Sequence, residues 1–244
     1  MKDIRPEKTL TTKMTQIIDY IEKSLFEYNK LQREFTIFGK TMVFIKDLLP
    51  DHVNIKNVIG SIEAIIPPHL TNEVDMIYIG QFKDFEDRDI NSMFKDASIF
   101  VTNQQDDDDD MIDDIVHEVA HSLEKSEFGS YIYGDASVEL EFLGKRKRLY
   151  FIMKEHGLNV NSERFMNMNY SQKFDDYLYR QVGYEGLANL AMGLFINPYS
   201  ITDIREYFAT GFAEYLMGDQ KYLRTISPFL YKKIEELVNY ESEY

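Results

Sequence analysis

The thirteen residues from Met111 to Leu123, MIDDIVHEVAHSL, constrain this chain more than any other segment. Their apolar side chains recur every three or four positions, which predicts a helix with one buried face. His117 and His121 are four positions apart, so their imidazoles lie one turn apart on the same side of this helix. Two imidazoles in this arrangement can hold one Zn²⁺ ion, and Glu118 can reach a water molecule beside it. The H-E-x-x-H pattern therefore predicts a catalytic metal centre on a central helix.

The alternative is an accidental H-E-x-x-H match on a solvated helix face. The flanking apolar stripe is too long for that interpretation, since it comprises Met111, Ile112, Ile115, Val116, Val119, Ala120 and Leu123. Histidines on a buried helix need hydrogen-bonding or metal partners, because an unpaired buried imidazole is costly. We therefore favour the metal site.

The composition of the chain limits the chemistry of such a site. The 244 residues fit one large domain or two small ones, and 44% apolar and 14% aromatic content is enough for a substantial core. The absence of cysteine excludes disulfides, thiolate ligands and cysteine nucleophiles. Any zinc must therefore be bound by His, Asp or Glu.

The charge balance argues against polyanionic partners. A net charge of −15 disfavours non-specific binding to nucleic acid or to an anionic membrane, so we expect neither partner. No apolar run is long enough for a transmembrane helix, and the N-terminus lacks the apolar core of a Sec signal. We expect a cytoplasmic protein, or one released by a non-Sec route or within a viral or toxin assembly.

Two charged runs have simple structural interpretations. The acidic run from Asp106 to Asp110 favours the start of the metal-binding helix, because negative charge complements the helix dipole. A Ca²⁺ site is the alternative there, but the run has no EF-hand spacing. The basic run from Lys145 to Arg148 is typical of a charged helix face paired with carboxylates, and nucleic-acid contact is its alternative.

Periodicity and turn signals predict a mostly helical α+β fold with a small mixed β-sheet before the active-site helix. Helices are expected over 54–66, 137–156 and 173–195, the last of them interrupted or bent near Gly183 and Gly186. Residues 157–172 read as a loop, and Pro67-Pro68 ends the first helix. Strands are expected over 42–49, 76–82 and 97–102. An amphipathic helix over 11–33 gives an N-terminal segment, 1–35, packed on the main domain.

A catalytic zinc usually takes three protein ligands, and two residues compete for the third position. Glu141 lies twenty residues after His121, with Glu139 nearby, which is the spacing of thermolysin-like enzymes. An extended metzincin motif is excluded, because Glu124 and Glu127 occupy the positions of its glycine and third histidine.

Glu206 is the better candidate because of its relation to Tyr199. The two residues are seven apart, close to two helical turns, so both side chains can point into one cleft. Ser200 followed by Asp203 suggests that a helix starts at these residues, with Tyr199 just before its N-terminus.

These residues make the chain resemble the catalytic domain of anthrax lethal factor and the related bacterial Pro-Pro endopeptidases. The resemblance rests on the HEVAH segment at 117–121 and on Tyr199 followed seven residues later by Glu206-Tyr207-Phe208-Ala209, and it continues weakly through Phe212 and 227–229. It implies a zincin-type fold in which His117, His121 and Glu206 bind one Zn²⁺. It also implies that Glu118 is the general base and that Tyr199 stabilises the oxyanion.

The sequence departs from this family in three respects. The interval of eighty-five positions from His121 to Glu206 implies a helical insertion at about 137–190 within a metallopeptidase domain spanning 36–244. Thr210 stands where family members often carry an acid. No substrate-pocket residue is matched, so Pro-Pro specificity does not carry over.

The sequence thus predicts a zinc-dependent endopeptidase in which Glu118 activates a water molecule. A protein or peptide substrate would bind as an extended strand at a sheet edge beside the metal. Asp114, one turn before His117, is a candidate hydrogen-bond acceptor for its imidazole. The rival hypothesis is a non-catalytic structural or interaction module that keeps a metallopeptidase fold, and the intact Glu118 argues against it.

Overall fold

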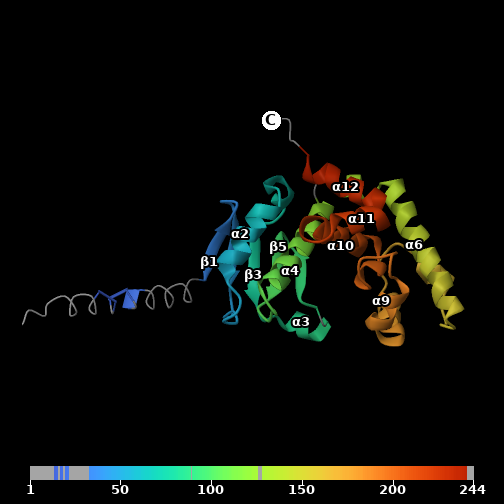
Figure 1. The fold of residues 1–244 in the computed structure, drawn as a ribbon, viewed down its shortest axis with the longest axis horizontal. Helices are drawn as coiled ribbons and strands as arrows, with labels where there is room; N and C mark the ends of the chain where they lie inside the picture. The colour runs from blue at the N-terminus through green and yellow to red at the C-terminus, as the bar shows by residue number, and fades with distance from the viewer. Residues whose placement is uncertain are drawn as a thin grey trace, which may run out of the picture.

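The computed structural model describes residues 33–88, 90–125 and 128–240, together with six positions between 14 and 21. It has the expected α+β fold, in which helices predominate beside one small mixed sheet (Figure 1). The helix expected over 11–33 lies mostly outside the described residues. Its described positions are helical, and Met14, Ile17 and Tyr20 are exposed there. The packing of the segment 1–35 on the main domain therefore stays a prediction.

The sheet has five strands in the order β1-β2-β3-β5-β4. Its central strands β2 (Thr41–Ile45), β3 (Met76–Gly80) and β5 (Ser98–Thr102) run parallel to one another. Each outer strand, β1 (Glu34–Ile37) or β4 (Ser92–Lys95), pairs antiparallel with its neighbour through a hairpin. Both hairpin turns contain two consecutive residues with positive φ, which is the geometry that suits the twist of paired strands.

Every second side chain along the central strands points to the same face of the sheet, and these side chains form buried rows across it. Ile77 of β3 lies opposite Val43 and Ile99, and Ile79 lies opposite Val101, and all five side chains are buried. The strands expected at 76–82 and 97–102 are confirmed with slightly shorter bounds. The strand expected at 42–49 ends at Ile45. The sequence analysis missed β1 and β4, because each has only four residues and β1 carries polar residues at two of them.

The first helices pack on this sheet. Helix α2 (Ile55–Ile65) confirms the helix expected over 54–66 and packs on β1 and on α4 (Asp108–Ser122). A short 3₁₀ turn, η1 (Pro68–Thr71), follows the two prolines. Helix α3 (Lys83–Arg88) lies between β3 and β4 in the chain. Asp108 of α4 accepts hydrogen bonds from the backbone N–H of Asn54 and the side-chain amide of Asn57, which joins α4 to the start of α2.

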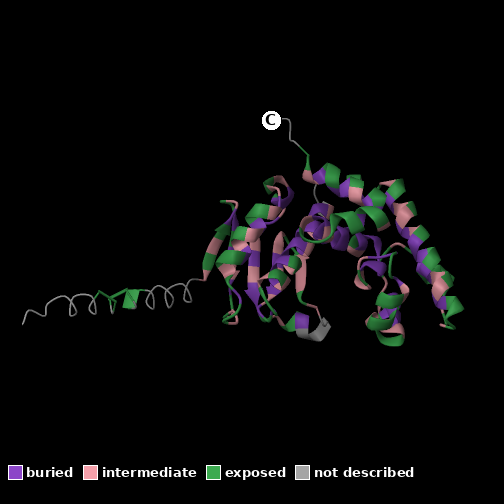
Figure 2. Ribbon diagram, viewed as in Figure 1, coloured by how far each residue is buried: buried purple, intermediate pink, exposed green. Residues whose placement is uncertain are grey.

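Helix α4 occupies the centre of the molecule, as expected from its apolar stripe. It contacts β4 and β5 on one side and α10 (Ile204–Met217) on the other (Figure 1). Eight of its fifteen residues are buried, in the purple band that crosses the middle of Figure 2. His117 and His121 of α4 can therefore meet Glu206 of α10 across the contact between these two helices.

The C-terminal half is helical. After α4 come η2 (Leu123–Lys125), α5 (Phe128–Tyr133) and the long α6 (Ala136–Glu155), which confirms the helix expected over 137–156. The last elements of the described chain are η4 (Tyr199–Ile201), α10, α11 (Gln220–Ile226) and α12 (Pro228–Val238). In Figure 1, α6 lies alongside these last helices, away from the sheet. No helix in the described ranges combines the length and the apolar character needed to cross a membrane.

The segment between α6 and α10 differs in part from the expectation. The loop expected over 157–172 is wrong in that it contains a short helix, α7 (Ser162–Met166), capped by the Asn161 side chain. The helix expected over 173–195 is interrupted at Gly183, as expected, but it consists of α8 (Gln172–Asp176), a π-helical segment η3 (Tyr177–Val182) and α9 (Tyr184–Leu190). The break falls at Gly183, whose φ of 82° favours glycine, whereas Gly186 lies within α9 without bending it.

The first two residues of the basic run do not belong to a charged face paired with carboxylates, as had been expected, because their hydrogen-bond partners are hydroxyls and backbone carbonyls. Lys145 and Arg146 are buried, whereas Lys147 and Arg148 are exposed. Lys145 donates hydrogen bonds to the hydroxyls of Tyr207 and Ser227, so it links α6 to α10 and to the start of α12. The way α6 packs against its neighbours decides which of the four basic residues are buried. The composition of the run could not predict this.

Candidate metal centre

Helix α4 begins as its acidic sequence predicts. The Asp107 side chain caps it by accepting from the backbone N–H of Asp110 at 2.9 Å, and three further aspartates stand in the first turn. Their negative charge complements the N-terminal end of the helix dipole. Because the helix is anchored here and buried along one face, the positions of His117 and His121 on it follow from the helical period.

Helix α10 supplies the third side chain from its first turn. Asp203 caps this helix, since its Oδ1 accepts from the backbone N–H groups of Arg205 at 2.8 Å and Glu206 at 3.0 Å. The sequence had suggested that Ser200 contributes to this cap, but it does not. Its hydroxyl donates instead to the carbonyl of Asn197, just before the turn η4. The helix start is nevertheless close to the expected place, and it directs Glu206 toward α4.

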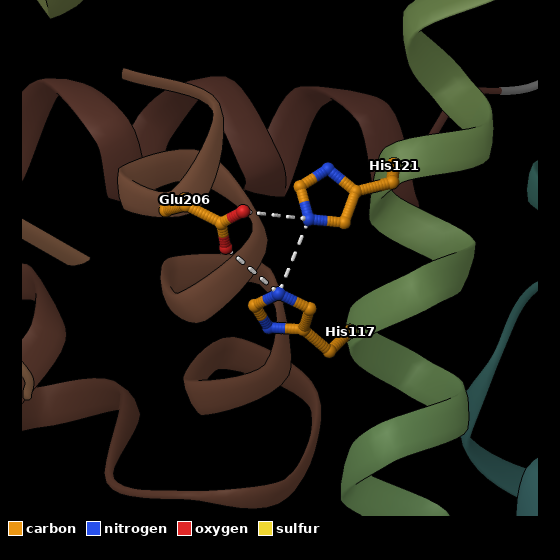
Figure 3. Close-up of side chains that lie close together, drawn as sticks. All are labelled: His117, His121 and Glu206. Carbon is orange, nitrogen blue, oxygen red and sulfur yellow. Dashed lines mark hydrogen bonds and ion pairs between the residues drawn. The ribbon is translucent and has the colours of Figure 1, made fainter. Parts of the chain in front are cut away.

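The three side chains expected to bind metal converge between these two helices (Figure 3). The Nε2 atom of His117 lies 3.0 Å from Oε2 of Glu206, and the two imidazole Nε2 atoms lie 3.2 Å apart. The Nε2 atom of His121 is 3.4 Å from Oε1 of Glu206. Ligand atoms around a tetrahedral zinc, at bond lengths near 2.0–2.1 Å, are separated by about 3.3 Å. The donor atoms therefore already have the spacing that a tetrahedral ion requires.

No other group of three potential His, Cys, Asp or Glu ligands this close occurs in the described part of the chain. His117, His121 and Glu206 retain 18%, 16% and 14% of their side-chain exposure, so the group is sheltered but reachable from solvent. It could hold a metal ion.

The charges in the group favour an ionised carboxylate. Burial raises the pKa of Glu206, but hydrogen bonds from His117 and His121 outweigh it and lower this pKa to about 2. Burial lowers the pKa of His121, and the hydrogen bond and charge of Glu206 outweigh that effect, so the pKa lies above its usual value. Glu206 is thus an anion at neutral pH and is ready to bind a cation.

Glu124 fixes the orientation of His121, a role that the sequence analysis missed. The Nδ1 atom of His121 lies 2.8 Å from Oε1 of Glu124 and can donate to it, so that Nε2 could offer its lone pair to a metal ion once its own proton is lost. Arg205 forms an ion pair with the other oxygen of Glu124, and the Tyr133 hydroxyl donates to Oε1 at 3.4 Å. The available signal was the spacing, because a residue three positions after His121 on a helical turn lies on the same side.

Glu118, the expected general base, is buried and has a partner from the sheet. The Ser92 hydroxyl of β4 donates to its Oε1 at 2.7 Å. This contact was not foreseeable, because β4 itself was not predicted. It places the expected base beside the terminal strand of the described sheet.

Comparisons with models of known protein families, with curated proteins and with solved structures find no match. The site is therefore interpreted from its own geometry and chemistry.

Tyr199 lies next to this group, in the turn η4 before α10. Its ring centroid is 6.5 Å from that of His117. Burial raises its pKa, and the nearby Glu206 carboxylate raises it further, so the hydroxyl keeps its proton across the physiological range. A protonated tyrosine in this place can act as a hydrogen-bond donor.

Two other sequence-based candidates have different partners. Glu141 accepts hydrogen bonds from the Tyr207 hydroxyl at 2.8 Å and from the backbone N–H groups of Phe229 and Leu230 at the start of α12. It does not join the His-His-Glu group. Asp114 accepts from the Gln105 amide at 2.8 Å, and burial raises its pKa to about 7. Glu141, the alternative third ligand, and Asp114, the expected partner of His117, therefore both accept hydrogen bonds from other residues.

Proposed function

We propose that this chain is a zinc-dependent endopeptidase. The observation that carries the proposal is the approach of Glu206 to within 3.0 Å of His117, across the packed helices α4 and α10. Two imidazoles and one carboxylate, with an adjacent glutamate on the same helix as the imidazoles, are the ligand and base set of zinc peptidases.

The residues present fit zinc better than the hard cations. Two of the three donors are imidazole nitrogens, whereas Ca²⁺ and Mg²⁺ are bound mainly by oxygens. The donor spacing matches a tetrahedral zinc, and Glu124 orients His121 in the manner typical of metal-binding histidines. When bound, zinc would polarise the scissile carbonyl and lower the pKa of a water molecule.

The chain's own groups would perform the remaining steps. Glu118 would take a proton from the attacking water at its carboxylate and deliver it to the leaving amine. Ser92, which donates to Glu118, would hold this carboxylate in place during both transfers. The Tyr199 hydroxyl would donate to the oxyanion that develops on the substrate carbonyl.

The sheet supports a binding mode for the substrate. β4 is the terminal strand of the described sheet on the side of α4, and its first residue contacts Glu118. A peptide lying in extended form along β4 would therefore pass the expected base. The substrate would be a protein or peptide bound as an added strand.

The resemblance to anthrax lethal factor and the Pro-Pro endopeptidases remains part of this proposal. The shared elements are the H-E-x-x-H helix and the seven-residue spacing of Tyr199 and Glu206. In the described structure these elements bring the tyrosine, the carboxylate and the two histidines to one place.

The deciding experiment measures metal content and cleavage of a degenerate peptide library for the wild type and for Glu118→Ala. We expect about one zinc per chain in both proteins, and a loss of cleavage of about 10²–10⁴-fold in the variant, because general base catalysis contributes that much. Unchanged cleavage in Glu118→Ala would remove this residue from catalysis. Zinc-loaded wild type that cleaves nothing would favour the rival, a structural or interaction module.

A further inference from the structure

A second concave site lies outside the metal centre. A cavity of about 240 Å³ opens between α7, α8 and the π-helical segment η3. Phe165, Phe174 and Tyr177 line it, and Asn159, Arg164 and Gln181 bring polar side chains to it. None of these residues belongs to the His-His-Glu group, so the proposed peptidase activity does not account for the cavity.

A buried guanidinium lies behind its aromatic wall. Arg146 of α6 is fully buried, and its carbon Cζ is 4.4 Å from the ring centroid of Phe174 and 5.9 Å from that of Phe165. Its terminal nitrogens donate to the carbonyls of Asn167 and Arg164, at 2.6 and 3.2 Å. Its Nε atom has no hydrogen-bond partner, and no carboxylate among the described residues lies within ion-pair distance, although the charge of Asp203 acts on Arg146 from farther away. Buried charges are usually paired at contact distance, so this one is an exception.

Arg164 brings a second positive charge to the same place. Its side chain is exposed at the cavity, and its guanidinium makes no hydrogen bond or ion pair with any described residue. Arg180, by contrast, forms an ion pair with Asp176 one turn away. In a chain with a net charge of −15, two guanidinium groups without a carboxylate partner on either side of one wall are unusual.

We propose that this cavity binds the oxyanion group, carboxylate or phosphate, of a small molecule. Arg164 would contact the anion directly, the side-chain amides of Asn159 and Gln181 would donate to it, and Arg146 would add positive potential from behind the rings. The cavity is smaller than the roughly 300–1,000 Å³ of sites for drug-sized ligands. Its ligand is therefore limited to a few carbon atoms beyond the oxyanion.

The test is an amide-resolved NMR titration of the full chain, first with inorganic phosphate and then with acetate, at constant ionic strength. The chain is treated with chelator beforehand, so that neither anion can bind through a metal at His117 and His121. We expect saturable shifts within 159–181, with a dissociation constant of the order of 1 mM or lower for at least one anion. The tighter of the two probes decides between a phosphate and a carboxylate ligand.

Two variants test the direct contact. Arg164→Gln should weaken binding at least tenfold, because it removes the positive charge that would contact the anion. Arg180→Gln is the matched control, since it removes a nearby exposed arginine that already has a partner, and it should bind like the wild type. Arg164 and Arg180 are both exposed, so neither change threatens the fold.

Either of two results would overturn the proposal: no shifts within 159–181 up to about ten times the expected dissociation constant, or equal loss of binding in Arg164→Gln and Arg180→Gln. The readout is binding to metal-free protein, so it is independent of whether the chain cleaves peptides.

Discussion

At the scale of single residues, Glu124 connects the metal centre to its surroundings. It contacts His121, Arg205 and Tyr133, which come from α4, α10 and α5. Such acceptors fix the tautomer of a metal-binding histidine, and their loss typically reduces metal affinity by about 10–100-fold.

Glu124→Ala should therefore lower zinc affinity by about 10–100-fold, measured by competition with a chromophoric chelator. Glu139→Ala is the control, because Glu139 lies nearby in sequence at the start of α6 without a contact to the histidines. If both substitutions left the affinity unchanged, Glu124 would not orient His121.

The third ligand can be assigned by a pair of equivalent substitutions. Glu206→Ala should release zinc, because it removes one of three donors, whereas Glu141→Ala should retain it, as measured by elemental analysis after dialysis. Glu141→Ala should instead lower the free energy of unfolding by about 1–3 kcal/mol, since the Tyr207 hydroxyl and two N–H groups of α12 lose their acceptor. Release of zinc only by Glu141→Ala would contradict the ligand set and the resemblance to lethal factor.

At the scale of secondary-structure elements, β4 positions the expected base. This strand of four residues ends the described sheet, and its Ser92 hydroxyl donates to the Glu118 carboxylate on α4. The carboxylate is thus held between a helix and a strand, which restricts its rotation.

Ser92→Ala should reduce kcat by about two- to tenfold, the effect of one lost hydrogen bond, with zinc content and KM little changed. Ser92→Thr keeps the hydroxyl and should restore most of kcat. Steady-state kinetics on the best peptide from the library would measure both variants. A change confined to KM would show that Ser92 acts on the substrate and not on Glu118.

At the scale of the whole molecule, a buried polar network joins the C-terminal helices. Lys145 of α6 donates to Tyr207 of α10 and Ser227 before α12, and Tyr207 donates in turn to Glu141. Burial lowers the pKa of Lys145 to about 8, from a usual value of 10.5, and the charge of Glu141 only partly opposes this. Tyr207 is adjacent to Glu206, so the network also supports the helix that carries the third ligand.

This pKa predicts how stability depends on pH. Between the folded pKa and the higher unfolded pKa the unfolded chain binds more protons, so stability rises with pH in that interval. Below pH 8 the cost of burying the ammonium is fully present, and it is relieved as the pH rises. Relative to a Lys145→Met variant, the wild type should gain about 1 kcal/mol of unfolding free energy from pH 7 to 9, measured by chemical denaturation at each pH. Parallel pH profiles for the two proteins would contradict the lowered pKa.

The elements that local periodicity specifies were predictable, and those that depend on distant neighbours were not. The apolar stripe of α4 and the β-branched runs of β3 and β5 fold as expected, because their side-chain spacing matches one period. The strands β1 and β4 are too short for a period to be recognised, and the sheet stabilises them through their hairpin partners. The interruption of the helix at 172–190 was predictable from Gly183. The π-helical segment before this glycine was not, because no local sequence pattern indicated it.

The sequence by itself determined the helix that carries the H-E-x-x-H motif, the placement of His117 and His121 on one side of it and the adjacent position of Glu118, because four residues make about one turn of any α-helix. The spacing of Tyr199 and Glu206 also favoured Glu206 over Glu141 as the candidate for the third ligand. Only the tertiary structure, however, decided where each of these two side chains lies. His121 and Glu206 are eighty-five positions apart, and no local rule sets the distance between such positions. That distance follows from the packing of α4 against α10, and the packing of α4 against β4 likewise brings Ser92 to Glu118.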